Sequence, residues 1–399
     1  MARRVVLMVV LLGVWGCTSM DDLQRQKAQR LAHEIIILDA HMDVPYRLSR
    51  QMEDISVSAP GGNFDYPRAR SGGLDAVFMA IYVPSGPMNK TGLRQRADTL
   101  IDMVEEIARN NPEKFAMARS PDDITHNFAN GVISLLLGIE NGAAIEDDIT
   151  NIEHFYKRGV RYITLTHVKD NFICDSSFDT TRTWKGLSSF GREVVLEMNR
   201  LGCMIDVSHV SDDAFYQILE LSRAPVIATH SCCRSFTPGL ERNLSDDMIR
   251  KLAAGGGVVH LNFSSMFLLD KCWRQMHAER QAVTAWLEEN NLDWESEERR
   301  TFQEKYRVSH PIIYGSITDF VDQLDHVVRV AGIDHVGFGS DFDGVDDILP
   351  AGMKDVSCYP EILYELFKRG YSESDVRKIT SGNTFRVWRA IERVAETDG

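Results

Sequence analysis

Histidines and carboxylates stand at the ends of several apolar runs in this sequence. The run at 35–38 leads directly into "DAHMD", which places His41 and Asp43 two positions apart. Five more residues of the same two kinds follow other apolar runs: Glu140, His167, His209, His230 and Asp341. Imidazole nitrogen and carboxylate oxygen are ligands that suit zinc. The residue types therefore predict a metal centre, provided that the fold brings the ends of these runs together.

The apolar runs have the length and composition of buried strands, and amphipathic segments separate them. Most are continuous, as expected for parallel strands that are covered on both faces. The eight predicted strands span 34–43, 74–84, 132–142, 160–168, 203–210, 225–231, 257–263 and 335–344. Eight strand–helix alternations in a chain of 399 residues predict a (β/α)8 barrel of the TIM type, an α/β fold. A doubly wound open sheet is the alternative, but no GxGxxG motif follows the first strand.

In a (β/α)8 barrel the active site lies at the C-terminal ends of the strands. Residues two apart on a strand point the same way, so His41 and Asp43 can face one metal ion. Each residue alone has a simpler explanation, because a histidine can be a hydrogen-bonded structural residue and a carboxylate can cap the next helix. Six of the eight predicted strands would each need such an explanation, so we favour one shared site. His260, inside the seventh predicted strand, is predicted to be structural.

Composition and charge limit the classes of function and the domain organisation. The formal net charge of −14 disfavours nucleic-acid binding, which usually requires a basic face. We predict one large domain over 35–399, preceded by a tether and a helix over 17–34. Charged, helix-prone residues over 264–313 predict a helical insertion after strand seven. It is either a lid at the active-site end of the barrel or a solvated helical hairpin without a role in the site.

The N-terminal segment has the pattern of an export signal. Two arginines precede an apolar stretch that ends in Gly16-Cys17. The stretch is too short to span a bilayer, which takes roughly 20 residues. It resembles a bacterial lipoprotein signal, in which residues 1–16 are removed and Cys17 carries the lipid. An ordinary secretory signal cut elsewhere is the alternative. In either case export is expected, and Thr18 favours the periplasmic face of the outer membrane or the cell surface.

Longer motifs around the candidate ligands resemble the membrane dipeptidase (renal dipeptidase) family of zinc peptidases. The matching stretches run from about residue 35 to 390. They include "GGLDAVFMAIYVP", "GIENG", "GVRYITLTH", "GLSSFGREVVLEMNRLGCMIDVSHVS", "PVIATHS", "GVVHLNF", "GFGSDFDGV" and "SGNTFRV". One departure lies beside a candidate ligand: Asn141, in "GIENG", stands where many members of the family have glycine.

The resemblance implies a (β/α)8 barrel that holds two zinc ions. It implies that His41 and Asp43 bind one ion and that His209 and His230 bind the other. Glu140 would bridge both ions. Relatives are often dimers, so the resemblance also makes a homodimer possible.

The resemblance also implies three residues that contact the substrate, a short peptide. The resulting hypothesis is a zinc-dependent dipeptidase in which a metal-activated water attacks the peptide bond. Asp341, near the substrate amine, would pass the proton of that water to the leaving amine. His167 would stabilise the developing oxyanion. The planar fork of Arg242 suits a free C-terminal carboxylate, which would restrict the enzyme to short peptides.

Two other classes of function remain open. Another barrel metallohydrolase, such as a deaminase or a cyclic-amide hydrolase, usually begins with HxH on the first strand and often uses a bridging lysine. Here His41 and Asp43 give HxD, and the candidate bridge is Glu140. The second alternative is a non-catalytic surface lipoprotein that keeps the barrel as a binding module. Such a protein would not need a full ligand set together with Asp341.

Overall fold

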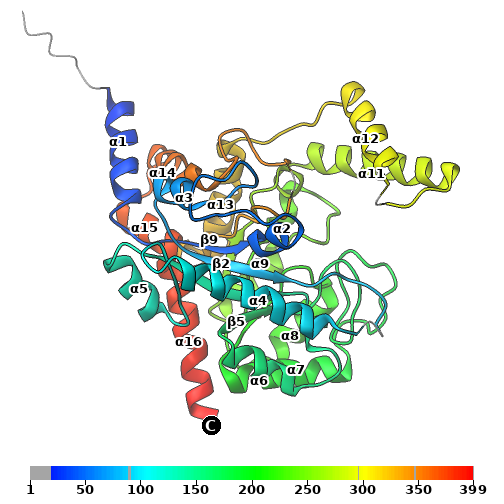
Figure 1. The fold of residues 1–399 in the computed structure, drawn as a ribbon. Helices are drawn as coiled ribbons and strands as arrows, with labels where there is room; N and C mark the ends of the chain where they lie inside the picture. The colour runs from blue at the N-terminus through cyan, green and yellow to red at the C-terminus, as the bar shows by residue number, and fades with distance from the viewer. Residues whose placement is uncertain (1–18, 89–90, 295, 346, 399) are drawn as a thin grey trace, which may run out of the picture.

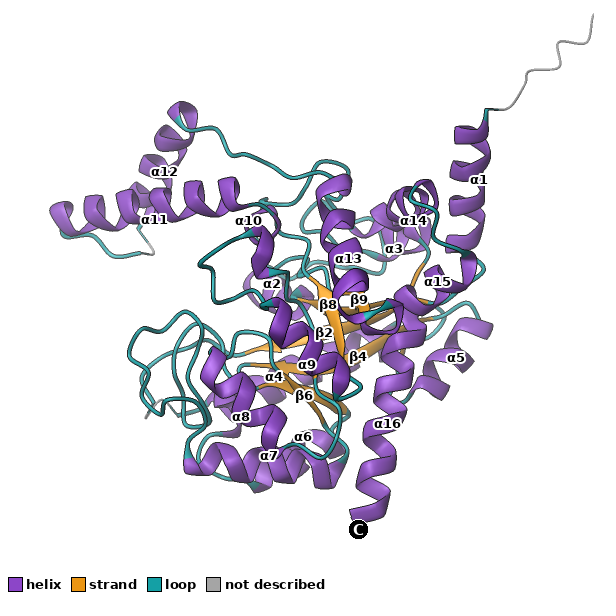
Figure 2. Cartoon of the chain, turned by 180° about the vertical axis from the view of Figure 1, so that it is seen from behind, coloured by secondary structure: helices purple, strands orange, loops and turns teal. Residues whose placement is uncertain are grey.

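The computed structural model describes residues 19–88, 91–294, 296–345 and 347–398. The predicted signal over 1–16 and the predicted lipidation site, Cys17, lie outside the described residues. Within the described part of the chain, a ring of helices surrounds a central sheet of parallel strands (Figures 1 and 2).

The sheet contains nine strands and closes on itself. The strand order is β2-β1-β9-β8-β7-β6-β5-β4-β3, and an additional pairing joins β2 to β4. Every pairing is parallel. The strands are β1 (Ile37–Met42), β2 (Leu74–Tyr82), β3 (Phe115–Met117), β4 (Ile133–Glu140), β5 (Val160–Thr164), β6 (Met204–Asp206), β7 (Ile227–Ala228), β8 (Val258–Leu261) and β9 (Val336–Phe338). Without β3 the remaining strands form a closed eight-stranded barrel, which confirms the (β/α)8 prediction.

Two features of the sheet differ from the predicted strands. β3 was not predicted, because three residues between two helices are too few to show a pattern; it pairs with Ile133–Leu135 of β4. β6 and β7 have only three and two residues, far fewer than the predicted 203–210 and 225–231. The chain leaves the sheet early there, so the candidate ligands after these strands lie on turns.

Most of the helices lie around the outside of the barrel (Figures 1 and 2). They are α1 (Met20–Ala32), α2 (Val44–Arg50), α3 (Tyr66–Gly72), α4 (Leu93–Asn110), α5 (Pro121–Ala129), α6 (Thr150–Lys157), α7 (Ser189–Leu201), α8 (Asp212–Leu221), α9 (Asp246–Ala254), α10 (Ser265–Leu268), α11 (Asp270–Asn290), α12 (Glu297–Ser309), α13 (Ile317–Ala331), α14 (Tyr359–Lys368), α15 (Glu373–Arg377) and α16 (Asn383–Asp398). No helix in the described ranges is long and apolar enough to cross a membrane.

The barrel interior explains why its strands are apolar. All six residues of β1 are buried, and Leu38 and Ala40 belong to an interior cluster with Phe78, Tyr162 and Trp388. Trp388 lies on α16, so this helix packs against the interior of the barrel.

His260 is placed as a structural residue within the same barrel. Its Nδ1 lies 3.0 Å from the carbonyl oxygen of Ala228, and its Nε2 lies 2.8 Å from Oγ1 of Thr384. Because both ring nitrogens have partners, the prediction that His260 is structural is confirmed.

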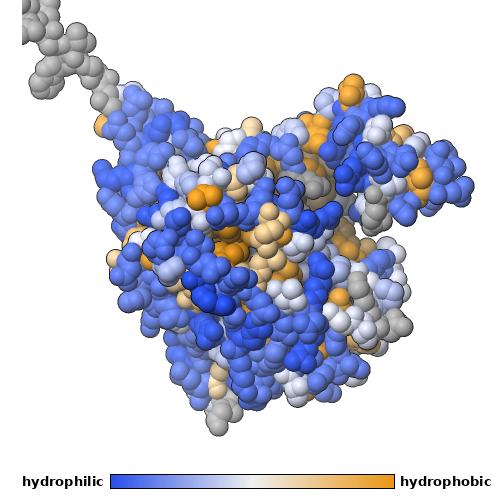
Figure 3. All heavy atoms as spheres, viewed as in Figure 1, coloured by the Kyte–Doolittle hydropathy of each residue, from blue (hydrophilic) through white to orange (hydrophobic). Residues whose placement is uncertain are grey.

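The segment after β8 forms a helical arm. In Figures 1 and 2, α11 and α12 project from the barrel. A buried carboxylate joins the two helices: Glu279 on α11 accepts hydrogen bonds from Arg307 and Gln303 on α12. Hydrophilic residues cover most of the face of the molecule in Figure 3, including much of the arm. This placement fits a solvated helical hairpin.

Candidate metal centre

The seven predicted strand-end residues come together at one end of the barrel. They fall into three overlapping groups in which one ligand atom per residue lies within 4.8 Å of the others. The groups are His41–Glu140–His230, Glu140–His167–His209 and His41–Asp43–Asp341. One such group could arise by chance, but three that share members form one continuous candidate site for metal ions.

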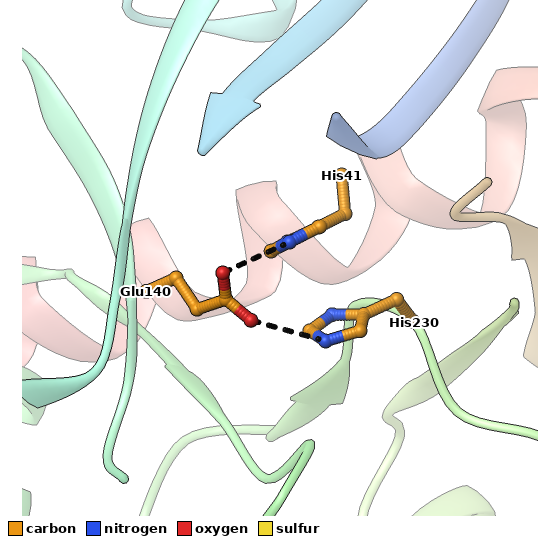
Figure 4. A group of neighbouring side chains, drawn as sticks. All are labelled: His41, Glu140 and His230. Atoms are coloured by element: carbon orange, nitrogen blue, oxygen red, sulfur yellow. Dashed lines mark ion pairs between the residues drawn. The ribbon is translucent and has the colours of Figure 1, made fainter. Parts of the chain in front are cut away.

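Glu140, the last residue of β4, lies between the histidines. Its Oε2 is 3.6 Å from Nε2 of His41, and its Oε1 is 3.5 Å from Nε2 of His230 (Figure 4). The same Oε1 lies 3.4 Å from Nε2 of His209 and 3.5 Å from Nε2 of His167. The two oxygens of one carboxylate thus face different histidines, which is the arrangement required of a bridging ligand.

Asp43 and Asp341 extend the centre on the side of His41. Oδ2 of Asp43 lies 3.5 Å from Nε2 of His41. Asp43 precedes α2 in the N-cap position, yet its side chain makes no capping hydrogen bond. Asp341 Oδ2 accepts a 2.7 Å hydrogen bond from the side chain of Asn262. The helix-capping explanation of Asp43 therefore fails in this structure, and its carboxylate is available to the site.

Gly344 permits the close approach of these two carboxylates. A Cβ atom at this position would lie 2.3 Å from Oδ2 of Asp43 and 2.5 Å from Oδ1 of Asp341. Both distances are far below van der Waals contact. Any larger residue at position 344 would displace the carboxylate of Asp43 or of Asp341. The arrangement of these two side chains therefore requires glycine at this position.

Half of the described non-glycine residues with positive φ lie at or beside the candidate ligands. Asn141, His209, Asp341 and Asp343 all have positive φ, at 76°, 69°, 62° and 67°. A non-glycine residue held there costs of order 1–3 kcal/mol, and such residues cluster at functional sites. The value at Asn141 also explains why glycine is suitable at this position in relatives, since glycine adopts positive φ without strain.

Burial changes the protonation of the centre. It raises the pKa of Asp43 to about 6, with nearby Glu140 adding to the effect, and raises the pKa of Asp341 to about 7. Burial also lowers the pKa of His167 to about 3 and holds the pKa values of His209 and His230 well below their ordinary range. His41 differs: although burial opposes it, Tyr162, Glu140 and Asp43 hold the pKa of His41 well above its ordinary range. Because neutral imidazoles are the form that binds metal ions, a bound ion would have to displace the proton of His41.

The donor set fits a metal cofactor. Nε2 of His41 is buried and has no hydrogen-bond partner among the described residues, although unsatisfied buried polar atoms are costly. A cation at this position would satisfy that nitrogen and compensate the buried carboxylates. Neutral imidazole and carboxylate together match the preferences of zinc and similar divalent ions.

Arg242 reaches the same centre from a loop. Its guanidinium donates to Oγ of Ser231 at 2.8 Å and to the carbonyl oxygen of His230 at 2.8 Å. Nη2 also lies 3.2 Å from Nε2 of His209, and the side chain is buried over the ring of Phe267. The structure thus places Arg242 on the side of the centre formed by His209 and His230.

A comparison with known families matches residues 25–398 to Membrane dipeptidase (Peptidase family M19). The chain belongs to this family. Solved relatives are described as metallo peptidases, so the protein is an enzyme of the metallo-dipeptidase type, and the cluster described above is its candidate metal centre. The family resemblance seen in the sequence is confirmed.

Named relatives support the assignment. Dipeptidase 3 of Mus musculus is 30% identical over 390 residues, which cover 94% of this chain and 68% of that protein. The crystal structure of the probable dipeptidase PvdM from Pseudomonas aeruginosa superimposes with a TM-score of 0.80 at 26% identity, covering 94% of this chain and 99% of that one. A metallo peptidase from Rhodobacter sphaeroides, liganded with a phosphinate mimic of the dipeptide L-Ala-D-Ala, gives a TM-score of 0.73 at 26% identity, covering 90% and 99%.

Four polar residues of this family member were not predicted from the sequence. Tyr162 lies 2.8 Å from Nδ1 of His41 through its hydroxyl, and Asn262 binds Asp341. Asp206 and Thr229 lie behind His230. All four are buried and lie within or directly after apolar strands. Their signal in the sequence is a polar residue that interrupts or ends a strand, which is too common to identify them.

Proposed function

We propose that the protein is a zinc-dependent dipeptidase with two zinc ions, bridged by Glu140. His41 and Asp43 would bind one ion, and His209 and His230 the other. The observation that carries the proposal is the position of Glu140, whose two carboxylate oxygens face the two sets of ligands from the centre. The relative from Rhodobacter sphaeroides, with its bound dipeptide mimic, supports the substrate class.

The residues around the ions suit peptide hydrolysis. Bound zinc would supply a Lewis acid and lower the pKa of a water molecule. Asp341, whose pKa is raised by burial to about 7 in the metal-free protein, lies beside the proposed ligands, where its carboxylate can take a proton from water and return it to the leaving amine. Asn262 holds one oxygen of Asp341 and leaves the other directed towards Asp43. His167, neutral because burial lowers its pKa, can donate a hydrogen bond to the developing oxyanion.

Arg242 would limit the enzyme to short peptides. Its Nε is buried without a hydrogen-bond partner among the described residues, so its guanidinium retains a donor for a ligand. A guanidinium matches a carboxylate through two parallel hydrogen bonds. Recognition of a free C-terminus so close to the metal ligands leaves room for one residue after the cleaved bond.

The test is a substrate panel that varies only the peptide ends. Purified full chain, with zinc content measured in the same sample, would be given dipeptides, the same dipeptides as C-terminal amides, and matched tripeptides. We expect hydrolysis of the free dipeptides and little of the amides or tripeptides. Equal rates on the amides would reject the role of Arg242. Failure on every dipeptide by a zinc-loaded sample would reject the dipeptidase proposal.

We also propose that the chain is an exported lipoprotein anchored through Cys17. The support is the sequence pattern over residues 1–17, in which a short apolar stretch ends in Gly16-Cys17. The expected location is the periplasmic face of the outer membrane or the cell surface. The homodimer stays a prediction, and light scattering of the purified chain in detergent would test it.

A further inference from the structure

His230 is backed by a chain of hydrogen bonds that leads away from the metal centre. Its Nδ1 lies 2.7 Å from Oγ1 of Thr229. The same hydroxyl donates to Oδ2 of Asp206 at 2.6 Å, and the backbone N–H of Thr229 donates to Oδ1 of Asp206 at 2.9 Å. His230, Thr229 and Asp206 are all fully buried. The Asp206–Thr229–His230 chain is therefore protected from exchange with water.

The carboxylate of Asp206 accepts four hydrogen bonds, two on each oxygen. Besides the two donors of Thr229, it receives the Thr164 hydroxyl at 2.5 Å and the backbone N–H of Ser208 at 3.0 Å. Backbone N–H groups can only donate, and a carboxylate can only accept. A buried carboxylate that is saturated with donors stays in place, so it is a fixed point at the start of the chain.

The direction of the hydrogen bonds fixes the tautomer of His230. A threonine hydroxyl has one hydrogen, and that hydrogen is directed to Asp206. Oγ1 of Thr229 must then accept a hydrogen bond from Nδ1–H of His230. A neutral imidazole carries one hydrogen, so Nε2 is left with its lone pair. Nε2 is the atom that faces Glu140, at 3.5 Å from Oε1.

We propose that Asp206 and Thr229 are positioning residues, which hold His230 in the tautomer that binds metal through Nε2. The inference deepens the proposed function and rests on its assignment of His230 as a metal ligand. Partners of this kind orient a ligating histidine and raise its basicity. The Thr229 hydroxyl lies between the Asp206 carboxylate and the His230 ring. It fixes the orientation of the ring and keeps the negative charge of Asp206 from direct contact with it.

The other candidate ligands lack this arrangement, which makes the inference specific. Nδ1 of His209 is buried without a hydrogen-bond partner in the described part of the chain. Nδ1 of His41 lies 2.8 Å from the Tyr162 hydroxyl rather than from a carboxylate-backed group. Loss of the Thr229 hydroxyl should therefore weaken the ion bound by His230 more than the ion bound by His41.

The test compares Thr229→Val with Thr229→Ser in the full chain. Valine has nearly the shape of threonine but no hydroxyl, whereas serine keeps the hydroxyl. Zinc affinity would be measured by competition with a chromophoric chelator, and circular dichroism of the metal-free proteins would check folding. We expect Thr229→Val to lose roughly 10- to 100-fold in affinity for one of the two ions, with the other ion and the serine variant close to wild type. Wild-type affinity for both ions in a folded Thr229→Val would overturn the proposal.

A second measurement needs no variant and still applies if the valine variant does not fold. The nitrogen chemical shifts of the imidazole rings in the metal-free wild-type chain, recorded by NMR at pH 8, report which ring nitrogen carries the proton. We expect His230 to carry it on Nδ1, and a proton on Nε2 would overturn the proposal. If wild-type protein binds no zinc, the proposed function fails while the tautomer result still decides the role of Asp206 and Thr229.

Discussion

The Nε2 atoms of His209 and His230 lie 2.8 Å apart in a buried part of the barrel. Arg242, which can only donate, lies 3.2 Å from Nε2 of His209, and Thr229 directs the lone pair of His230 to the same place. Two lone pairs at this distance repel unless a proton, as in a hydrogen bond between the two rings, or a metal ion lies between them. Two imidazole nitrogens bound tetrahedrally to one zinc ion at 2.0–2.1 Å are roughly 3.3 Å apart. A shared metal ion would thus need only a small outward movement of the rings.

The close contact of His209 and His230 predicts that a bound metal ion stabilises the folded protein as well as taking part in the reaction. The full chain should hold close to two zinc ions, and chelation should abolish dipeptide hydrolysis. Chelation should also lower the melting temperature, because a ligand that binds only the folded state stabilises it by about 2.7 kcal/mol at a hundred times its Kd. Metal analysis, activity and thermal unfolding on one preparation, before and after added zinc, provide the check. Full activity in a metal-free sample would contradict the metal mechanism.

Glu140→Gln should disturb both halves of the centre at once. The amide retains the size of the carboxylate but loses its charge and one of its two ligand oxygens, which face His41 and His209. We expect the content of both zinc ions to fall together, with a loss of activity of roughly 100-fold or more because the metal ions no longer stabilise the transition state. Glu153→Gln, which changes a half-exposed glutamate paired with Lys157, is the matched control. Unchanged metal content in Glu140→Gln would show that this residue does not bridge.

Sequence and structure agree where the signal is local. The apolar runs identified the eight barrel strands, and His41, Asp43 and Glu140 follow from the ends of β1 and β4. The partners behind the ligands could not be found this way. Thr229 meets Asp206 only because β6 and β7 are neighbours, and Tyr162 reaches His41 across the barrel interior. Such contacts depend on strand register, which periodicity does not specify.

Asp75 should make stability depend on pH at a distance from the metal centre. This aspartate near the start of β2 is buried and accepts a hydrogen bond from Ile37 N–H. Burial raises its pKa to about 7, whereas the unfolded chain has the ordinary value of about 3.9. Between these values the folded state holds a proton that the unfolded state has lost. The free energy of unfolding therefore falls as pH rises through this range.

Asp75→Asn removes this dependence because an amide does not ionise. The free energy of unfolding of the variant minus that of wild type should increase by about 1–3 kcal/mol from pH 5 to pH 8. Denaturant unfolding of the metal-free proteins at both pH values measures the change, since the other titrating groups are the same in both. Asp122→Asn, at an exposed carboxylate, is the control. An equal difference from wild type at the two pH values would contradict the buried, protonated Asp75.

Cys17→Ser tests the proposed anchor. If Cys17 carries lipid, the serine variant should move from the membrane fraction to the soluble fraction. Several acyl chains hold a protein stably on a membrane, whereas one chain binds weakly. Fractionation after a high-salt wash is the measurement, and Ser19, two residues on, offers a Ser19→Ala control that should remain with the membrane. A serine variant that still sediments would remove the main support for the lipoprotein.

Asp341→Asn should separate proton transfer from metal binding. The amide has nearly the same size, and its oxygen can still accept the hydrogen bond that Asn262 donates to Asp341. Its amide hydrogens can donate to the Asp43 carboxylate, because the side chains of Asp43 and Asp341 already share a hydrogen bond. The fold and the zinc ions should therefore remain. An amide does not accept the proton of a water molecule as a carboxylate does, and loss of such help costs roughly 100- to 10,000-fold in rate.

The loss should fall mainly on kcat, because the interaction is made in the transition state. A larger rise in KM would show that Asp341 also binds the substrate amine. The competing explanation is that Asp341 only supports the loop after β9, and asparagine would then preserve most of the activity. Steady-state rates on one good dipeptide, with zinc content measured in the same sample, separate the two. Near wild-type turnover with both ions bound would reject Asp341 as the proton shuttle and leave proton transfer to another group at the centre.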